Sequence, residues 1–295
     1  MKPLTTWEPC LADMNRGVAF FDGITIEADR ITDPRWERVL PILEEEQVFM
    51  CRMMDPSLRE HSGAWVLDIG TGSGVFAIYA AKRGCRVVAI DISARALRFA
   101  RQNARTNKIP ITETEPAPGE VQFLNCSYKE MLEDGKFDFV IIAPPYNPTC
   151  EEFHPALHAE AGPLGQQCFE EQLPHVARLL KSDGTCIGNQ MMVVNRAGDF
   201  DVKPLLQRHF SGWEFNYLRI LPKDILVDDF LNGQYASYLN PDMNSNVDQQ
   251  FQIWKCKTTS YQLIPAINFI AYRFPLPQKK WLFGEINRDI KMKYN

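Results

Sequence analysis

Glycine recurs at alternate positions, Gly70, Gly72 and Gly74, between a short apolar run and a helical pattern. Because glycine has no Cβ, a backbone that contains it can turn tightly and approach a bound ligand closely. The next apolar run ends at Asp91. A carboxylate there can accept hydrogen bonds from both ribose hydroxyls of an adenosine, although it can also simply cap the following helix. The order of strand, glycine turn, helix, strand and acid favours a nucleotide site.

A second chemical pattern lies at Ala143, Pro144, Pro145 and Tyr146, directly after the apolar run 137–142. Proline has no amide hydrogen, so the carbonyl groups of Ala143 and Pro144 are available as outward-facing acceptors. They can hold an amine with its lone pair toward an electrophile, and Tyr146 can stack on a flat substrate. The alternative is that the prolines only end a strand. Since ligands sit at the carboxyl ends of parallel strands, the pattern favours catalytic roles for Pro144 and Tyr146.

Two histidines follow this turn, His154 and His158, with Pro155 between them. On a helix, residues four apart share a face, so the pair can bind a metal or supply a general base. Pro155 and the lack of a third ligand argue against a metal, and we predict no metal site. One histidine is expected near the substrate as a base or orienting group, and the alternative is a surface pair.

Apolar runs alternate with helical patterns along the middle of the chain. Strands are predicted at 64–69, 86–90, 121–124, 137–142 and 185–194, with a further pair at 213–221 and 267–274. Helices are predicted at 75–83, 94–108 and 167–180, and an N-terminal one over 36–54 that starts near Asp33. This alternation predicts a parallel sheet covered by helices on both faces.

The motifs resemble those of a known superfamily. VLDIGTGSG at 66–74 and VVAIDIS at 87–93 look like motifs one and two of class I S-adenosylmethionine (SAM)-dependent methyltransferases. FDFVIIAPPYNP resembles the fourth motif of the amino-methyltransferase branch, and the segment 161–184 is similar to the glutamine methyltransferases of release factors. The likeness covers residues 63–195. It implies a Rossmann-like fold, a seven-stranded mostly parallel sheet with helices on both faces.

The same resemblance implies SAM as cofactor and assigns roles by position. Gly70, Gly72 and Gly74 would line its methionine and ribose parts, Asp68 would orient the loop and the methionine amine, and Asp91 would hold the ribose. The remaining expected cofactor contacts are Ile92 on the adenine, then Asn125, Cys126, Ser127 and Ala143.

Two positions depart from the family pattern. Ser127 stands where an acidic residue commonly accepts the adenine amino group, so Ser127 or Asn125 would have to take that contact. Ala143 stands where the amino-methyltransferase branch has a residue with a side-chain acceptor. The missing acceptor counts against methylation of glutamine amides or base amines, whose nitrogen has two hydrogens that need partners.

Four segments follow from these patterns: an N-terminal cap segment with helical character at 1–62, a SAM-binding core at 63–223, a substrate lid inserted between the last two strands at 224–263, and the last core strand with the tail at 264–295. The insertion is rich in amides and aromatic residues, and a loop of that length usually carries function. The aromatic residues can also form only a small satellite core.

Composition narrows the class of substrate. The 295-residue chain has a net charge of −5, which removes the electrostatic argument for nucleic acid binding. Its eight cysteines form no C-x-x-C pair, and no signal peptide or membrane span is evident, so a cytoplasmic location is expected. We therefore expect a SAM-dependent methyltransferase that acts on a small molecule, with nitrogen as the favoured acceptor.

Three alternatives remain open from the sequence. The first is a protein glutamine or nucleic-acid amino methyltransferase. The second is an enzyme that transfers or cyclises the aminobutyrate arm of SAM and releases methylthioadenosine. The third is a SAM-binding partner without activity.

Overall fold

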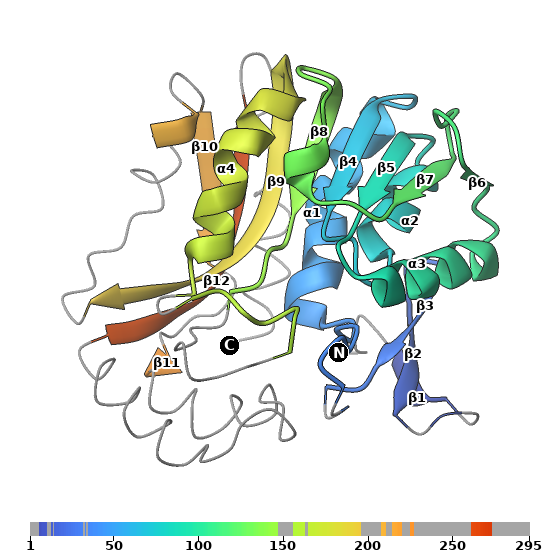
Figure 1. Cartoon of the computed structure of the whole chain (residues 1–295), viewed down its shortest axis with the longest axis horizontal. Helices are drawn as coiled ribbons and strands as arrows, with labels where there is room; N and C mark the ends of the chain where they lie inside the picture. Colours follow the sequence, from blue (N-terminus) through green and yellow to red (C-terminus); the bar gives the residue numbers. More distant parts are fainter. Residues whose placement is uncertain are drawn as a thin grey trace.

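The computed structural model describes residues 6–10, 13, 15–31, 33, 35–146, 156–162, 165–195, 208–210, 214–219, 225–226 and 261–272. These residues form a small antiparallel sheet near the N-terminus and a large sheet covered by helices (Figure 1). None of the helices in the described part of the chain has the length and apolar character needed to cross a membrane.

Six neighbouring strands of the large sheet run parallel. In spatial order they are β9 (Leu180–Asn195), β8 (Phe137–Ile142), β4 (Trp65–Ile69), β5 (Arg86–Ile90), β7 (Val121–Leu124) and β6 (Ile111–Thr112). The order along the chain changes direction at β4, which lies between β5 and β8. Ligands of open parallel sheets bind at such a switch point, outside the carboxyl ends of the strands.

Three antiparallel strands complete the sheet beyond β9: β12 (Tyr261–Tyr272), β10 (Glu214–Arg219) and the two-residue β11 (Ile225–Leu226). The predicted α/β fold is thereby confirmed. Its seven predicted strands correspond to the longer strands of the sheet, and the two-residue strands β6 and β11 extend it to nine. The lid predicted at 224–263 lies outside the described residues except for β11 and the first residues of β12.

Helices cover both faces of the sheet because its strands are apolar on both sides. Val66 and Val87 face the side packed by α1 (Phe49–Glu60), α2 (Val75–Ala81) and α3 (Ala94–Thr106). Leu67 and Val88 face the other side, where α4 (Gln167–Leu179) packs (Figure 1). Such double coverage is the expected arrangement for buried parallel strands.

The N-terminal region differs from the prediction. Residues 35–43 are not helical, and a π-helical turn, η1 (Glu44–Val48), leads into α1, so the helix predicted over 36–54 is wrong in its first half. Before it, β1 (Thr6–Pro9), β2 (Arg16–Phe21) and β3 (Ile24–Asp29) form an antiparallel sheet. Asp22 and Gly23 connect β2 and β3 with positive φ angles of 47° and 73°. An Asp-Gly pair between alternating apolar residues is a hairpin signal that the prediction missed.

Candidate active site

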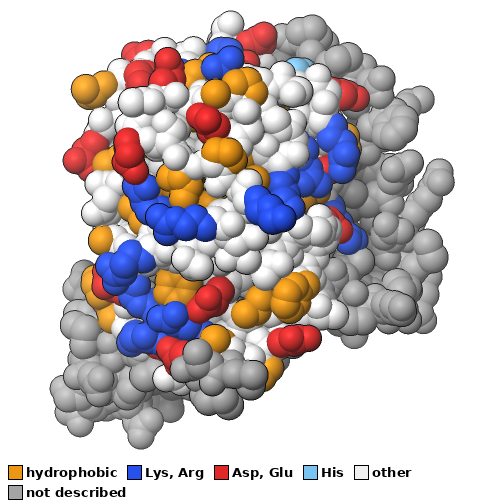
Figure 2. Space-filling model, turned by 90° about the vertical axis from the view of Figure 1, so that its right-hand side faces the viewer, with side chains coloured by type: hydrophobic (Ala, Val, Ile, Leu, Met, Phe, Trp, Pro, Cys, Tyr) orange, Lys and Arg blue, Asp and Glu red, His pale blue; other side chains and the backbone are white. Residues whose placement is uncertain are grey.

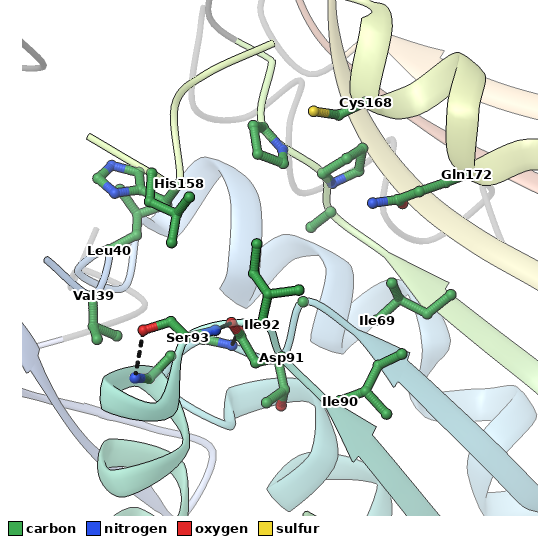
Figure 3. A pocket seen from close by; sticks show the side chains of 18 of the residues that line it. Val39, Leu40, Ile69, Ile90, Asp91, Ile92, Ser93, His158, Cys168 and Gln172 are labelled. Atoms are coloured by element: carbon green, nitrogen blue, oxygen red, sulfur yellow. Dashed lines mark hydrogen bonds between the residues drawn. The ribbon is translucent and has the colours of Figure 1, made fainter. Parts of the chain in front are cut away.

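A cavity of about 630 Å³ opens at the carboxyl ends of β4, β5 and β8. Its walls come from four parts of the chain: the strand ends, residues 37–47 before α1, residues 126–129, and residues 157–162 and 167–172 around the start of α4. Figure 3 shows apolar side chains such as Ile69, Ile90 and Ile92 below the space and Cys168 and Gln172 reaching in from α4. The volume is that of an ordinary ligand site.

The glycine turn forms the floor of this cavity. The amides of Gly70 and Thr71 donate to the Ile90 carbonyl at 2.9 and 3.0 Å, which holds the turn against the end of β5. Gly70 and Gly72 have φ angles of 72° and 54°, and a Cβ at either would meet no side chain within 4 Å. At Gly74 a Cβ would lie 2.9 Å from the Ala100 Cβ of α3. The first two glycines therefore line the cavity, while the third allows α3 to pack closely.

Asp91 is fixed by backbone amides on both oxygens. Its Oδ2 accepts from Gly72 at 2.9 Å and its Oδ1 from Ser93 at 2.8 Å. Burial raises the pKa of Asp91, as does the nearby Glu37, while the two amides act in the opposite direction. The cap of α3 is the Ser93 hydroxyl, which accepts from the Ala96 amide at 3.2 Å. Asp91 is thus not needed as a cap and faces the cavity, beside an Ile92 that is 63% exposed.

Asp68 lies beneath the turn and is 1% exposed. Its Oδ2 accepts from the Thr71 hydroxyl at 2.6 Å and from the Ala77 amide at 3.2 Å, which ties the turn to α2. Its Oδ1 is buried with no hydrogen-bond partner among the described residues. Burial raises the pKa of Asp68 to about 7. Its position braces the turn, and its side chain is not part of the cavity lining.

The segment after β7 contributes Cys126 and Ser127 to the cavity. Ser127 is occupied locally: its hydroxyl accepts from the Lys129 amide and its amide donates to Glu130, a capping box at the 3-10 turn η2 (Tyr128–Glu130). Asn125 lies outside the lining, and its Nδ2 donates to the carbonyls of Asp91 and Ile92 at 2.8 and 3.1 Å. Asn125 therefore fixes the main chain of Asp91 and Ile92 and so helps to position their side chains.

The turn after β8 forms the opposite side of the cavity. Ala143, Pro144 and Tyr146 all line it, and the Tyr146 hydroxyl donates to a carboxylate oxygen of Glu46 in η1. This hydrogen bond joins the turn to the N-terminal segment. Glu46 is a lining residue that the sequence did not suggest, because its approach to Tyr146 exists only in the folded chain.

His158 also lines the cavity, whereas His154 lies outside the described residues. The His158 Nδ1 donates to the Arg38 carbonyl at 3.2 Å. Burial, together with the nearby Arg38 charge, lowers the pKa of His158 to about 3. The ring is thus neutral near pH 7 and unsuited to act as a general base, although it can orient a neighbour. Residues 157–159 form a turn, so His158 does not stand on a helix.

Most of the predicted site residues that the structure describes line the cavity, but not all of them do. Those that line the cavity are Gly70, Gly72, Asp91, Ile92, Cys126, Ser127, Ala143, Pro144, Tyr146 and His158. Asp68, Gly74 and Asn125 support the lining from behind. Gln172 was missed, although a sequence signal exists: it occupies a position in the apolar stripe of α4.

A family model described as a methyltransferase domain matches residues 60–225, more than half of the chain. The chain belongs to the methyltransferase-domain family. The predicted resemblance to methyltransferases is confirmed, and the matched region includes the strand ends, the glycine turn and α4.

Relatives of this methyltransferase act on different substrates. A release factor glutamine methyltransferase of Chlorobaculum tepidum is 33% identical over 180 residues, 57% of this chain and 58% of that protein. A tRNA (uracil(54)-C(5))-methyltransferase of Pyrococcus horikoshii is 39% identical over 83 residues, 28% of this chain and 18% of that protein. This chain spans less than two thirds of either relative. A SAM-dependent methyltransferase from Agrobacterium tumefaciens shares the fold, with a TM-score of 0.51, 13% identity, and coverage of 88% of this chain and 70% of that chain.

The cofactor of the methyltransferase is SAM, and the cavity fits it. The open side of Gly70 and Gly72 gives the ligand room that a Cβ would fill. Asp91 offers a carboxylate whose remaining lone pairs can accept ribose hydroxyls, and the exposed Ile92 offers an apolar surface for a flat base.

Proposed function

We propose that this methyltransferase transfers the methyl group of SAM to a nitrogen atom of a small molecule. The observation that carries the proposal is the turn of Ala143 and Pro144 at the cavity wall, where a main-chain carbonyl next to a proline can accept an N–H. Residues 37–47, 157–162 and 167–172 line the space beside this turn. Walls on several sides of the turn favour a small acceptor over the surface of a macromolecule.

Each lining group has a task in this proposal. Asp91 and the glycine turn bind and orient the cofactor, which supplies a sulfonium methyl group whose carbon accepts the nitrogen lone pair as its bond to sulfur breaks. The carbonyls of Ala143 and Pro144 direct that lone pair toward the methyl group. Tyr146, fixed by Glu46, closes the wall. Since SAM is intrinsically reactive, alignment of the two reactants supplies much of the acceleration.

The second candidate acceptor is a protein glutamine or a nucleic-acid base. It is favoured by the similarity to a release factor glutamine methyltransferase and to a tRNA methyltransferase. Lys and Arg side chains do gather across the face that Figure 2 shows, mixed with Asp and Glu. On α3, however, Arg101 pairs with Glu113 and Arg95 with Asp29. The net charge of −5 and the missing side-chain acceptor at Ala143 also weigh against this candidate.

The test begins with the full chain and SAM in a calorimetric titration, followed by mass spectrometry of mixtures with a panel of small amines, alcohols and thiols. N-methylated amines with S-adenosylhomocysteine as co-product are expected. Methylation of oxygen or sulfur alone would contradict the nitrogen assignment. Methylthioadenosine formed from SAM without an acceptor would instead identify transfer or cyclisation of the aminobutyrate arm, and binding without turnover a non-catalytic partner.

Tyr146→Phe tests whether the hydrogen bond between Tyr146 and Glu46 serves turnover. The variant loses the hydrogen bond to Glu46 but keeps the ring, so we expect kcat to fall about tenfold, because one neutral-to-charged hydrogen bond is worth about 1.5–3 kcal/mol. The dissociation constant of SAM should stay within about twofold of the wild type. Equal losses in turnover and in SAM affinity would show that Tyr146 serves the cofactor rather than the acceptor.

A further inference from the structure

Gln172 is an unexplained polar residue in an apolar setting. It lies on α4, whose other buried residues are Phe169, Leu173, Val176 and Leu179. Spacings of three and four residues place Gln172 within this stripe, where an apolar side chain would be the ordinary choice. It is 7% exposed, and its Oε1 has no hydrogen-bond partner among the described residues. A buried amide without a partner costs free energy, so its presence calls for a reason.

The direction of the side chain points to a ligand. Gln172 lines the cavity together with Cys168, one turn earlier on α4, and Figure 3 shows both side chains extending from the helix into the same space. Cys168 is an unsuitable nucleophile, because burial raises its pKa to about 11. Glu171 also lines the cavity from α4, but its carboxylate oxygens accept from Gln167 and Lys129. The Gln172 amide oxygen is the buried acceptor of α4 that has no partner among the described residues.

The need for such a group arises at Ala143. Its methyl group packs against the core on the side of α1 and α2, so residue 143 contributes no side-chain acceptor to the cavity and can offer only its main-chain carbonyl. One carbonyl can satisfy one hydrogen of an amino group, and the second hydrogen needs another acceptor if the lone pair is to keep its direction. Gln172 Oε1 is an acceptor in the same cavity, reaching in from a different element.

We propose that Gln172 accepts the second hydrogen of the substrate's amino group and thereby supplies the acceptor that residue 143 lacks. This inference rests on the proposed function and narrows it to primary amines, since a nitrogen with two hydrogens satisfies both acceptors at once. Tertiary amines bring no hydrogen and are poor substrates. After methyl transfer the nitrogen carries the new methyl group and a positive charge, which the amide and carbonyl oxygens stabilise.

The experiment uses two probes that differ at the reacting position. Sinefungin carries an amino group on the carbon that replaces the methylated sulfur of SAM, whereas S-adenosylhomocysteine carries nothing there. Calorimetry on the full chain should show that Gln172→Leu weakens sinefungin binding about tenfold or more, as expected for loss of one charge-assisted hydrogen bond. Binding of S-adenosylhomocysteine should change by less than about twofold.

The controls separate folding, this inference and the proposed function. Gln122→Leu makes the same replacement on β7 outside the cavity and should leave both affinities unchanged. Gln172→Met, unbranched and of similar size, repeats the test, and thermal unfolding shows that both variants fold. If the ratio of sinefungin to S-adenosylhomocysteine affinity stays unchanged in both Gln172 variants, the proposed role of Gln172 is overturned and the proposed function is not. Failure of the wild type to bind either probe would overturn the proposed function as well.

Discussion

Asp91 shows how a binding group is arranged before its ligand arrives. A carboxylate on a flexible loop would lose conformational freedom on binding, whereas Asp91 already has both oxygens held by the amides of Gly72 and Ser93. Each oxygen keeps a lone pair for a further donor. The carboxylate is also largely desolvated, which is why its pKa is raised. A ligand with two adjacent hydroxyls therefore finds its acceptors pre-organised, and such pre-organisation improves affinity.

Asp91→Ala should weaken SAM binding about 100-fold, since two hydrogen bonds to a charged acceptor are worth about 3 kcal/mol or more together. Calorimetry with SAM measures the change, and the urea midpoint shows whether the variant remains folded. Asp134→Ala is the matched control, because Asp134 is bonded to Arg178 on the surface and lies away from the cavity. An unchanged SAM affinity in the Asp91 variant would refute the ribose site.

At the scale of elements, α3 connects the N-terminal sheet to the glycine turn. Asn103 on α3 and Asn107, the residue that follows its last turn, each bond both an amide and a carbonyl of β3: Asn103 at Glu27, and Asn107 at Thr25. The two side chains thus satisfy the edge of β3 in place of another strand. Asn103 Nδ2 also donates to the Ser73 carbonyl at 2.8 Å. Of these two asparagines, Asn103 is the one whose side chain also bonds the glycine turn.

The pair allows a controlled comparison. Asn103→Ala and Asn107→Ala should each lower the free energy of unfolding by about 1–3 kcal/mol, because each leaves partly buried backbone groups of β3 without these partners. Asn103→Ala should in addition weaken SAM binding about three- to tenfold through the released Ser73 carbonyl. Urea unfolding and calorimetry measure the two effects. Equal SAM affinity in both variants would show that Asn103 does not position the turn.

The sequence predicted elements whose signals are local. β4, β5 and β8 are uninterrupted apolar runs, and the glycine turn follows directly from residue types, so both were predicted. The hairpin around Asp22 was missed, although its turn signal is also local. Glu46 had no signal in the sequence, and the polar Gln172 in the apolar stripe of α4 was overlooked. That either residue lies at the cavity depends on how η1 and α4 pack against the sheet, which the sequence does not show. Likewise, burial determines the pKa of His158, and burial is a property of the folded chain.

Across the whole molecule, buried acids connect the cavity walls to the core. Asp29 is fully buried and accepts from Arg95 of α3 at 2.8 Å and from the Val39 amide at 2.6 Å. It therefore holds the segment before η1, which lines the cavity, against α3. Such a pair is costly to break, because removal of one partner leaves an uncompensated buried charge. Asp68 is the contrasting case, a buried acid with no cationic partner among its described hydrogen bonds.

That contrast gives Asp68 a measurable effect on the pH dependence of folding. Burial raises its pKa from 3.8 to about 7 in the folded chain, while the unfolded chain keeps an ordinary value. Between those values the folded protein binds a proton that the unfolded chain has released. The free energy of unfolding contributed by Asp68 is therefore fully present below pH 4 and decreases up to about pH 7, by at most about 1.4 kcal/mol per pH unit.

Asp68→Asn removes this titration while it preserves the shape of the side chain. We expect the difference in unfolding free energy between variant and wild type, measured by urea unfolding at pH 5, 6 and 7, to shift in favour of the variant as pH rises. Because the variant and the wild type share all other carboxylates, the pH-dependent contributions of those groups to the unfolding free energy cancel in the difference. They include Asp91, whose pKa in the folded protein is also raised. A difference that stays constant across this range would mean that Asp68 is already ionised in the folded protein. Its unpartnered Oδ1 would then have to be satisfied as a buried charge, at a cost of several kcal/mol.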